Sequence, residues 1–173
     1  MKRAWVIVLL SLLLLIGALF FLIRSLQQKM AYVDTVKLYE SFILKKELET
    51  KLKKVEDART KILDSLMLNL QVMSKNIETA KQRDQNEVNR FEAFREQYLQ
   101  KKKEFEEDNS KTAQSYTDQV WAQLNQYIKE YGKMNEYKFI FGTTGNGNLM
   151  YAREGDDVSK ELIEYVNEKY SGK

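Results

Sequence analysis

A row of aromatic side chains in the second half of a long helical stretch is the part of this sequence best suited to form a binding surface. Its members are Phe91, Phe94, Tyr98 and Phe105. Steps of three, four and seven residues place them on one face of a helix. They can offer adaptable apolar contacts to another polypeptide, or they can pack against a second helix of the same hairpin.

Catalytic chemistry has few candidate residues. The chain contains no His and no Cys, which removes the usual general base, the commonest zinc ligand and the thiol nucleophile. Gly145 and Gly147 lead into a strand-like run rather than a helix, so they predict a turn and not a phosphate-binding loop. The basic run 101–103 precedes acidic residues and predicts a solvated helix face. We expect no enzyme, no cofactor, no metal and no nucleic-acid partner.

The first 25 residues form a separate segment. Residues 4–23 are strongly apolar except for Ser11 and Gly17, and at ~1.5 Å per residue they would span about 30 Å, the hydrocarbon thickness of a bilayer. Possible cleavage sites place Ile16, Ile23 or Lys29 where a small residue is needed. This pattern favours a signal anchor over residues 1–25, with the remainder outside the cytoplasm. Cleavage, which would release a soluble protein, is the alternative.

A long antiparallel hairpin is predicted for residues 44–133. The chain has no proline, and no glycine between Gly17 and Gly132, so nothing there breaks a helix. The polar run 82–89 favours a reversal, although one unbroken helix is the alternative, and Gly132 is expected as the C-cap. A heptad seam is formed by Leu48, Leu52, Val55, Ile62, Leu66, Met73 and Ala80, weakened by Arg59, Asn69 and Asn76.

A small body is predicted from residues 30–43 and 134–173. Strands are expected at 30–35, 137–141 and 148–152, the last two flanking a Gly-rich turn, with a helix after a cap at Asp156, Asp157 or Ser159. The fold class is therefore α+β and mainly helical. Residues at alternate strand positions should form the core or a subunit interface: Tyr32, Val33, Phe139, Phe141, Leu149 and Tyr151.

This order of elements resembles the OmpH family of periplasmic chaperones, also called Skp. The closest stretches are residues 30–40, which look like the first strand and short helix of that family, and 137–166, which are similar to its closing pattern with Asp157-Val158-Ser159 before the last helix. The resemblance covers nearly all of the chain after Gln28. It implies a homotrimer whose helical hairpins surround a cavity that holds unfolded outer-membrane proteins without ATP.

Two function hypotheses follow. The first is a holdase chaperone for unfolded outer-membrane or envelope proteins, built as a trimer of residues 26–173 at the periplasmic face of the inner membrane. Residues 37–133 carry 19 basic and 17 acidic side chains, so apolar contacts and confinement should outweigh charge attraction. The second is a membrane-tethered coiled-coil scaffold or adaptor that binds a folded envelope partner.

Overall fold

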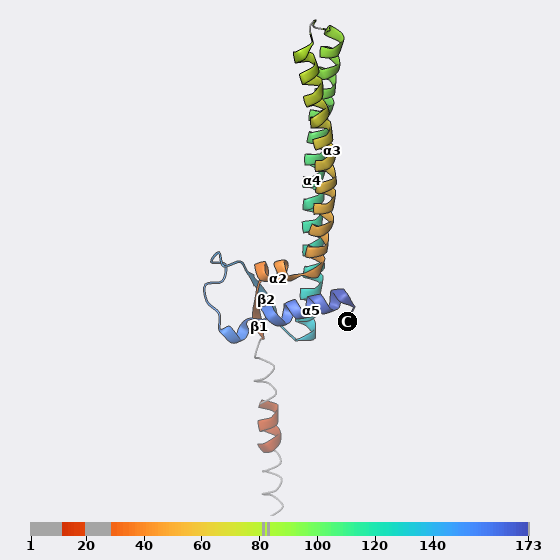
Figure 1. Cartoon of the computed structure of the whole chain (residues 1–173). Helices are drawn as coiled ribbons and strands as arrows, with labels where there is room; N and C mark the ends of the chain where they lie inside the picture. Colours follow the sequence, from red (N-terminus) through yellow and green to blue (C-terminus); the bar gives the residue numbers. More distant parts are fainter. Residues whose placement is uncertain (1–11, 20–28, 81, 83, 173) are drawn as a thin grey trace, which may run out of the picture. The chain divides into compact units, whose positions relative to one another are not determined.

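The computed structural model of the chain describes residues 12–19, 29–80, 82 and 84–172 (Figure 1). Residues 12–19 are helical. The anchor predicted at residues 4–23 lies mostly outside the described residues. Within the described ranges, no helix combines the length and the apolar character needed to cross a membrane.

The architecture is mainly helical, as the sequence predicted, but the sheet among the described residues has two strands rather than the three segments expected. The elements are β1 (Met30–Asp34), α2 (Thr35–Ser41), α3 (Ile43–Thr79), α4 (Gln85–Met134), β2 (Phe139–Thr143), the 3₁₀ helix η1 (Glu154–Asp156) and α5 (Ser159–Ser171). They fall into two compact units. The first consists of the described residues up to Leu38 and of Tyr127–Tyr165, and the second of Tyr39–Gln126 and the described residues from Val166 onward.

In the second unit α3 and α4 form the predicted hairpin (Figure 1). The chain reverses between Thr79 and Gln85, at the start of the polar run that predicted the turn. Asp84 prepares the start of α4, because its carboxylate accepts a hydrogen bond of 2.8 Å from the backbone N–H of Asn86. An Asp at this place satisfies a donor that the first helical turn leaves unpaired.

Phe42 interrupts the helix between α2 and α3 with an extended backbone, φ −73° and ψ 130°. The side chain of Asn167 bridges the interruption: it accepts a hydrogen bond of 2.9 Å from the N–H of Ile43 and donates one of 3.2 Å to the carbonyl of Ser41. Phe42 itself is fully buried and its ring lies 5.5 Å from that of Tyr170. The end of α5 therefore holds the start of α3.

The sheet of the first unit joins two distant parts of the sequence. Strand β1 pairs in parallel with β2, with Met30 opposite Phe139 and Asp34 opposite Thr143. The prediction of a strand at 148–152 was wrong, because these residues form a loop. Asn148 turns back to donate a side-chain hydrogen bond of 2.8 Å to the carbonyl of Gly142. Strand β2 therefore pairs with the distant β1 instead of forming a β-hairpin with residues 148–152.

The end of α4 also differs from the prediction. The helix passes through Gly132 and ends at Met134, and the chain then reverses at Glu136, which has a φ of 59°. Gly132 is buried, and a Cβ at this position would lie 3.4 Å from Cδ1 of Ile140. Gly132 is therefore an interior helix residue packed beside Ile140 and is not a C-cap.

Capping of α5 agrees with the prediction. The carboxylate of Asp157 accepts hydrogen bonds from the backbone N–H, at 2.8 Å, and from the hydroxyl of Ser159. The same hydroxyl accepts a 2.8 Å hydrogen bond from the N–H of Asp34. These bonds tie the end of β1 to the start of α5 within the first unit, whose buried side chains include Ala31, Val33, Leu38, Val158 and Leu162.

Candidate functional site

The row of α3 that faces α4 drifts away from the predicted heptad seam. Its buried or half-buried members are Leu48, Leu52, Arg59, Leu63, Leu66, Leu70, Met73 and Ile77. The predicted members Val55, Ile62, Asn69, Asn76 and Ala80 are instead exposed. A helix with 3.6 residues per turn rotates against a strict seven-residue repeat. The positions predicted for Ile62, Asn69 and Asn76 are thus occupied by the next residues in the sequence, Leu63, Leu70 and Ile77. Asn69 and Asn76 therefore do not weaken the seam.

Tight packing is concentrated at one end of the hairpin. Leu48, Val120 and Leu124 are 6%, 1% and 0% exposed. Beyond Arg59, Leu70 is buried on α3. Several other large apolar side chains in this part of the hairpin are exposed. These are Ile62, Met67, Leu68 and Val72 on α3 and Leu99 on α4. The outer half of the hairpin therefore keeps apolar surface available for binding.

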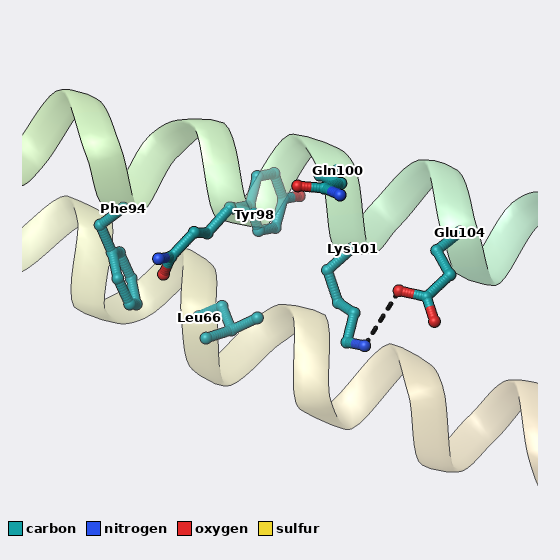
Figure 2. A pocket seen from close by; sticks show the side chains of 7 residues that line it. Leu66, Phe94, Tyr98, Gln100, Lys101 and Glu104 are labelled. Atoms are coloured by element: carbon teal, nitrogen blue, oxygen red, sulfur yellow. Dashed lines mark hydrogen bonds and ion pairs between the residues drawn. The ribbon is translucent and has the colours of Figure 1, made fainter.

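A pocket of about 350 Å³ lies between the two helices in this outer half, and Figure 2 shows the side chains that line it. Leu66 of α3 lies below Phe94 and Tyr98 of α4 and forms the apolar part of its lining (Figure 2). Its polar part is contributed by Gln97, Gln100, Lys101 and Glu104. The ammonium of Lys101 pairs with the carboxylate of Glu104 at 3.0 Å, so the rim carries no net charge.

A second pocket of about 470 Å³ shares Tyr98 with the first and is lined more extensively by apolar side chains. Its lining consists of Met67, Leu70, Gln71, Ser74, Phe91, Arg95, Tyr98 and Leu99. Leu99 is 53% and Met67 38% exposed. Three of the four predicted aromatic contacts, Phe91, Phe94 and Tyr98, therefore line pockets and also pack within the hairpin.

Phe105 has a different environment from the other three aromatics. The guanidinium of Arg59 lies 5.1 Å from its ring centre and the ammonium of Lys101 lies 5.2 Å from it. Arg59 also donates to the carboxylate of Asp108 and to the side chain of Asn109. Phe105 is thus part of a polar and cation–π link between α3 and α4, and it lines neither of the two pockets.

The six predicted core or interface residues lie in the first unit with very different exposure. Val33 is buried, and Tyr32 and Leu149 are half-buried. Phe139 and Phe141 are 49% and 48% exposed, with ring centres 5.9 Å apart, and Tyr151 is 82% exposed. Burial and the neighbouring carboxylate of Asp157 raise the pKa of Tyr32. An apolar, aromatic surface therefore remains open on β2 and the loop that follows it.

The described residues contain no cluster of three or more acidic side chains, His or Cys that could hold a metal ion. The open pockets of the hairpin present apolar and aromatic groups, and the charged side chains of their linings, Lys101, Glu104 and Arg95, are each in an ion pair. Such a surface suits binding rather than covalent chemistry.

Comparisons with known proteins agree with this architecture. Residues 29–166 match the model of a family described as Outer membrane protein (OmpH-like). The chain belongs to the OmpH-like family. A solved structure from Caulobacter crescentus CB15, assigned as an OmpH-like outer membrane chaperone, has the same fold with a TM-score of 0.72. The two chains are 14% identical, and the match covers 82% of this chain and 85% of the other. No curated protein matches the sequence.

Sequence reasoning missed three of the apolar residues that line the pockets of this OmpH-like chain. Met67, Leu70 and Leu99 were not identified, because the predicted seam passed through Ile62 and Asn69 instead of Leu63 and Leu70. A signal was present: Leu63, Leu66, Leu70, Met73 and Ile77 also alternate in steps of three and four. That row is entirely apolar, and this property would have selected it.

Proposed function

We propose that this protein is an ATP-independent holdase that binds unfolded outer-membrane or envelope proteins. Membership of the OmpH-like family supports a periplasmic, non-enzymatic chaperone role in general terms. The observation that carries the specific proposal is the outer half of the hairpin, where Phe91, Tyr98 and Leu99 border open apolar pockets.

Open pockets favour weak and reversible contacts. Covering a half-exposed leucine contributes only about 1 kcal/mol, at roughly 25 cal/mol per Å² of apolar area. Several such contacts hold an unfolded chain, while each can be released separately without ATP. The near balance of 19 basic and 17 acidic side chains over residues 37–133 fits capture through apolar contact.

The proposed assembly is a homotrimer with its hairpins around a cavity. An apolar surface beside the sheet of two short strands supports this assembly. It is formed by the exposed side chains of Phe139, Phe141 and Tyr151. Such a small sheet is marginal alone, and neighbouring copies can cover its edges. The proposal further places residues 4–23 in the inner membrane as an anchor and the remainder in the periplasm.

The test is suppression of aggregation when a urea-unfolded outer-membrane β-barrel is diluted into buffer containing the full chain. We expect protection at one trimer per client, measured by light scattering. The double variant Met67→Lys with Leu99→Lys should lose most of this protection, because charges then enter the larger pocket. Val72→Lys is the matched control, since Val72 is 51% exposed but lines neither pocket. Absence of protection even at large excess of the chain would refute the holdase proposal.

A further inference from the structure

A second heptad row on α3 remains uncovered by α4. Its members are Val55, Ala58, Ile62, Ser65, Asn69, Val72, Asn76 and Thr79, separated alternately by three and four residues. All of them are exposed, and none carries a charge. Val55, Ile62 and Val72 are 43%, 47% and 51% exposed. We call this row the α3 stripe.

The spacing of the α3 stripe matches a helix rather than an extended chain. An average step of 3.5 residues is the repeat with which two helices pack along a common seam. At 1.5 Å per residue, residues 55–79 extend over about 36 Å. An unfolded client has no periodicity that would require such a row, so the stripe is not explained by the pockets of the outer hairpin.

The charges nearest the α3 stripe are basic, because Asp57, Asp64 and Glu78 lie further round the helix from it. Lys54, Lys61 and Lys75 lie one position before Val55, Ile62 and Asn76 and therefore follow the same seven-residue repeat. All three lysines are exposed, and none forms an ion pair with a residue that the structure describes. Flanking charges of this kind choose the partner of a coiled coil through opposite charges on it. The complementary surface is apolar in its centre and acidic along its edge.

We propose that the α3 stripe docks an amphipathic helix of a partner protein, one with an apolar heptad row flanked by Glu or Asp. Asn69 and Asn76 occupy the same heptad position one repeat apart. A polar residue at such a position fixes register, because it is satisfied only opposite another polar group. The stripe shares no residue with the two pockets assigned to client binding, and Asn76 borders a separate, smaller pocket beside Ala80 and Glu87. The proposed docking is therefore independent of the proposed holdase activity.

A synthetic helix provides the test. The probe is a fluorescent peptide as long as the 55–79 segment, with a Leu and Ala heptad seam, one Asn in that seam and Glu at the flanking positions. Its binding to the full chain in mild detergent is followed by fluorescence anisotropy. The matched peptide carries Lys at the flanking positions. We expect the Glu peptide to bind about tenfold more tightly at low salt, with the difference shrinking as salt screens the lysines.

Variants of the chain locate the binding site of the peptide. Ile62→Lys and Val72→Lys should each weaken binding of the Glu peptide about tenfold or more, as charges in the centre of an interface do. Ser110→Lys, at an exposed site on α4, is the control and should leave binding unchanged. Circular dichroism confirms that the variants keep their helix content.

Four outcomes would overturn the proposal. Equal binding of the Glu and Lys peptides would remove the charge argument, and unchanged binding to Ile62→Lys and Val72→Lys would place the peptide elsewhere. A change in sedimentation mass in the same variants would show that a second copy of the chain occupies the α3 stripe. Loss of protection from aggregation in Val72→Lys would make the stripe a client surface instead, while the holdase proposal itself would stand.

Discussion

Removing the side-chain amide of Asn167 is the sharpest test of how α5 holds the start of α3. In Asn167→Ala the N–H of Ile43 loses its 2.9 Å acceptor and the carbonyl of Ser41 loses its 3.2 Å donor. Both groups flank the helix interruption at Phe42 and cannot be paired within a continuous helix. Phe42 remains buried beside them, so water reaches the freed groups only in part.

The expected loss follows from these two bonds. Each of the two neutral hydrogen bonds contributes about 1 kcal/mol net. Alanine returns roughly 0.5 kcal/mol through its higher helix propensity. The free energy of unfolding should therefore fall by about 1.5 kcal/mol. With a urea dependence of about 2 kcal/mol per molar, the midpoint moves down by roughly 0.7 M.

The assay is urea unfolding of the full chain in mild detergent, monitored by circular dichroism. Asn125→Ala is the matched control, because Asn125 is exposed on α4 and the substitution measures the propensity effect alone. The variant Asn167→Asp should fall between the two, since it keeps the acceptor for Ile43 and loses the donor for Ser41. If Asn167→Ala and Asn125→Ala gave the same midpoint, the bridging role of Asn167 would be refuted.

Further predictions concern packing, capping, assembly and dynamics. Leu124→Ala at a fully buried site should lower the free energy of unfolding by about 2–5 kcal/mol, whereas Leu99→Ala should change it by less than about 0.5 kcal/mol in the same urea titration. The hydrogen bond from the backbone N–H of Lys37 holds the pKa of Asp34 below its usual value. The stabilisation that this bond gives is therefore present above the unfolded pKa and is lost as pH falls through the lower folded pKa. The melting temperature of the wild type should accordingly fall in acid more steeply than that of Asp34→Asn; parallel curves would contradict this. Phe139→Asp should dissociate the proposed trimer and abolish client protection, and a wild-type monomer or dimer by light scattering would contradict the cavity. In hydrogen exchange, a holdase hairpin should exchange quickly in its outer half, while protection along its whole length would favour the tether.

The helical hairpin was predictable because its signals are local. The absence of Pro and Gly, the polar residues near Asp84 and the apolar rows on both sides all act within one or two turns. The facing row of α3 was harder to choose. Two rows of equal spacing lie side by side on this helix. The row with Leu63 and Leu70 differs from the row with Ile62 and Asn69 in being entirely apolar, and exposure in the folded hairpin shows that it meets α4.

The sheet could not be derived from local pattern. Phe139 and Tyr151 lie in runs of similar strand propensity around a Gly-rich turn, and such a pattern favours a hairpin. Parallel pairing of Phe139 with Met30 depends on groups more than a hundred residues apart in the sequence. The candidate site shows the same division: its aromatic residues follow from spacing on α4, whereas Met67 and Leu99 required knowledge of which helix faces meet.

The position of the hairpin between the two strands has a consequence for the order of folding. In an unfolded chain, pairing β1 with β2 closes a loop of 105 residues from Asp34 to Phe139. Once the hairpin has formed, Tyr39 stacks on Trp121 with ring centres 5.2 Å apart. Counted from this stack, the chain that leads to the strands is the five residues from Asp34 to Tyr39 and the eighteen from Trp121 to Phe139, and most of the latter belong to α4.

The entropy cost of closing a loop grows with the logarithm of the number of residues in it, so this shortening lowers the cost by about 1.3 kcal/mol. Formation of the helical hairpin should therefore precede strand pairing. The rate at which β1 pairs with β2 is then set by the local contacts of the helices. A substitution that loosens the stack of Tyr39 on Trp121 should slow the pairing of two strands to which neither ring belongs.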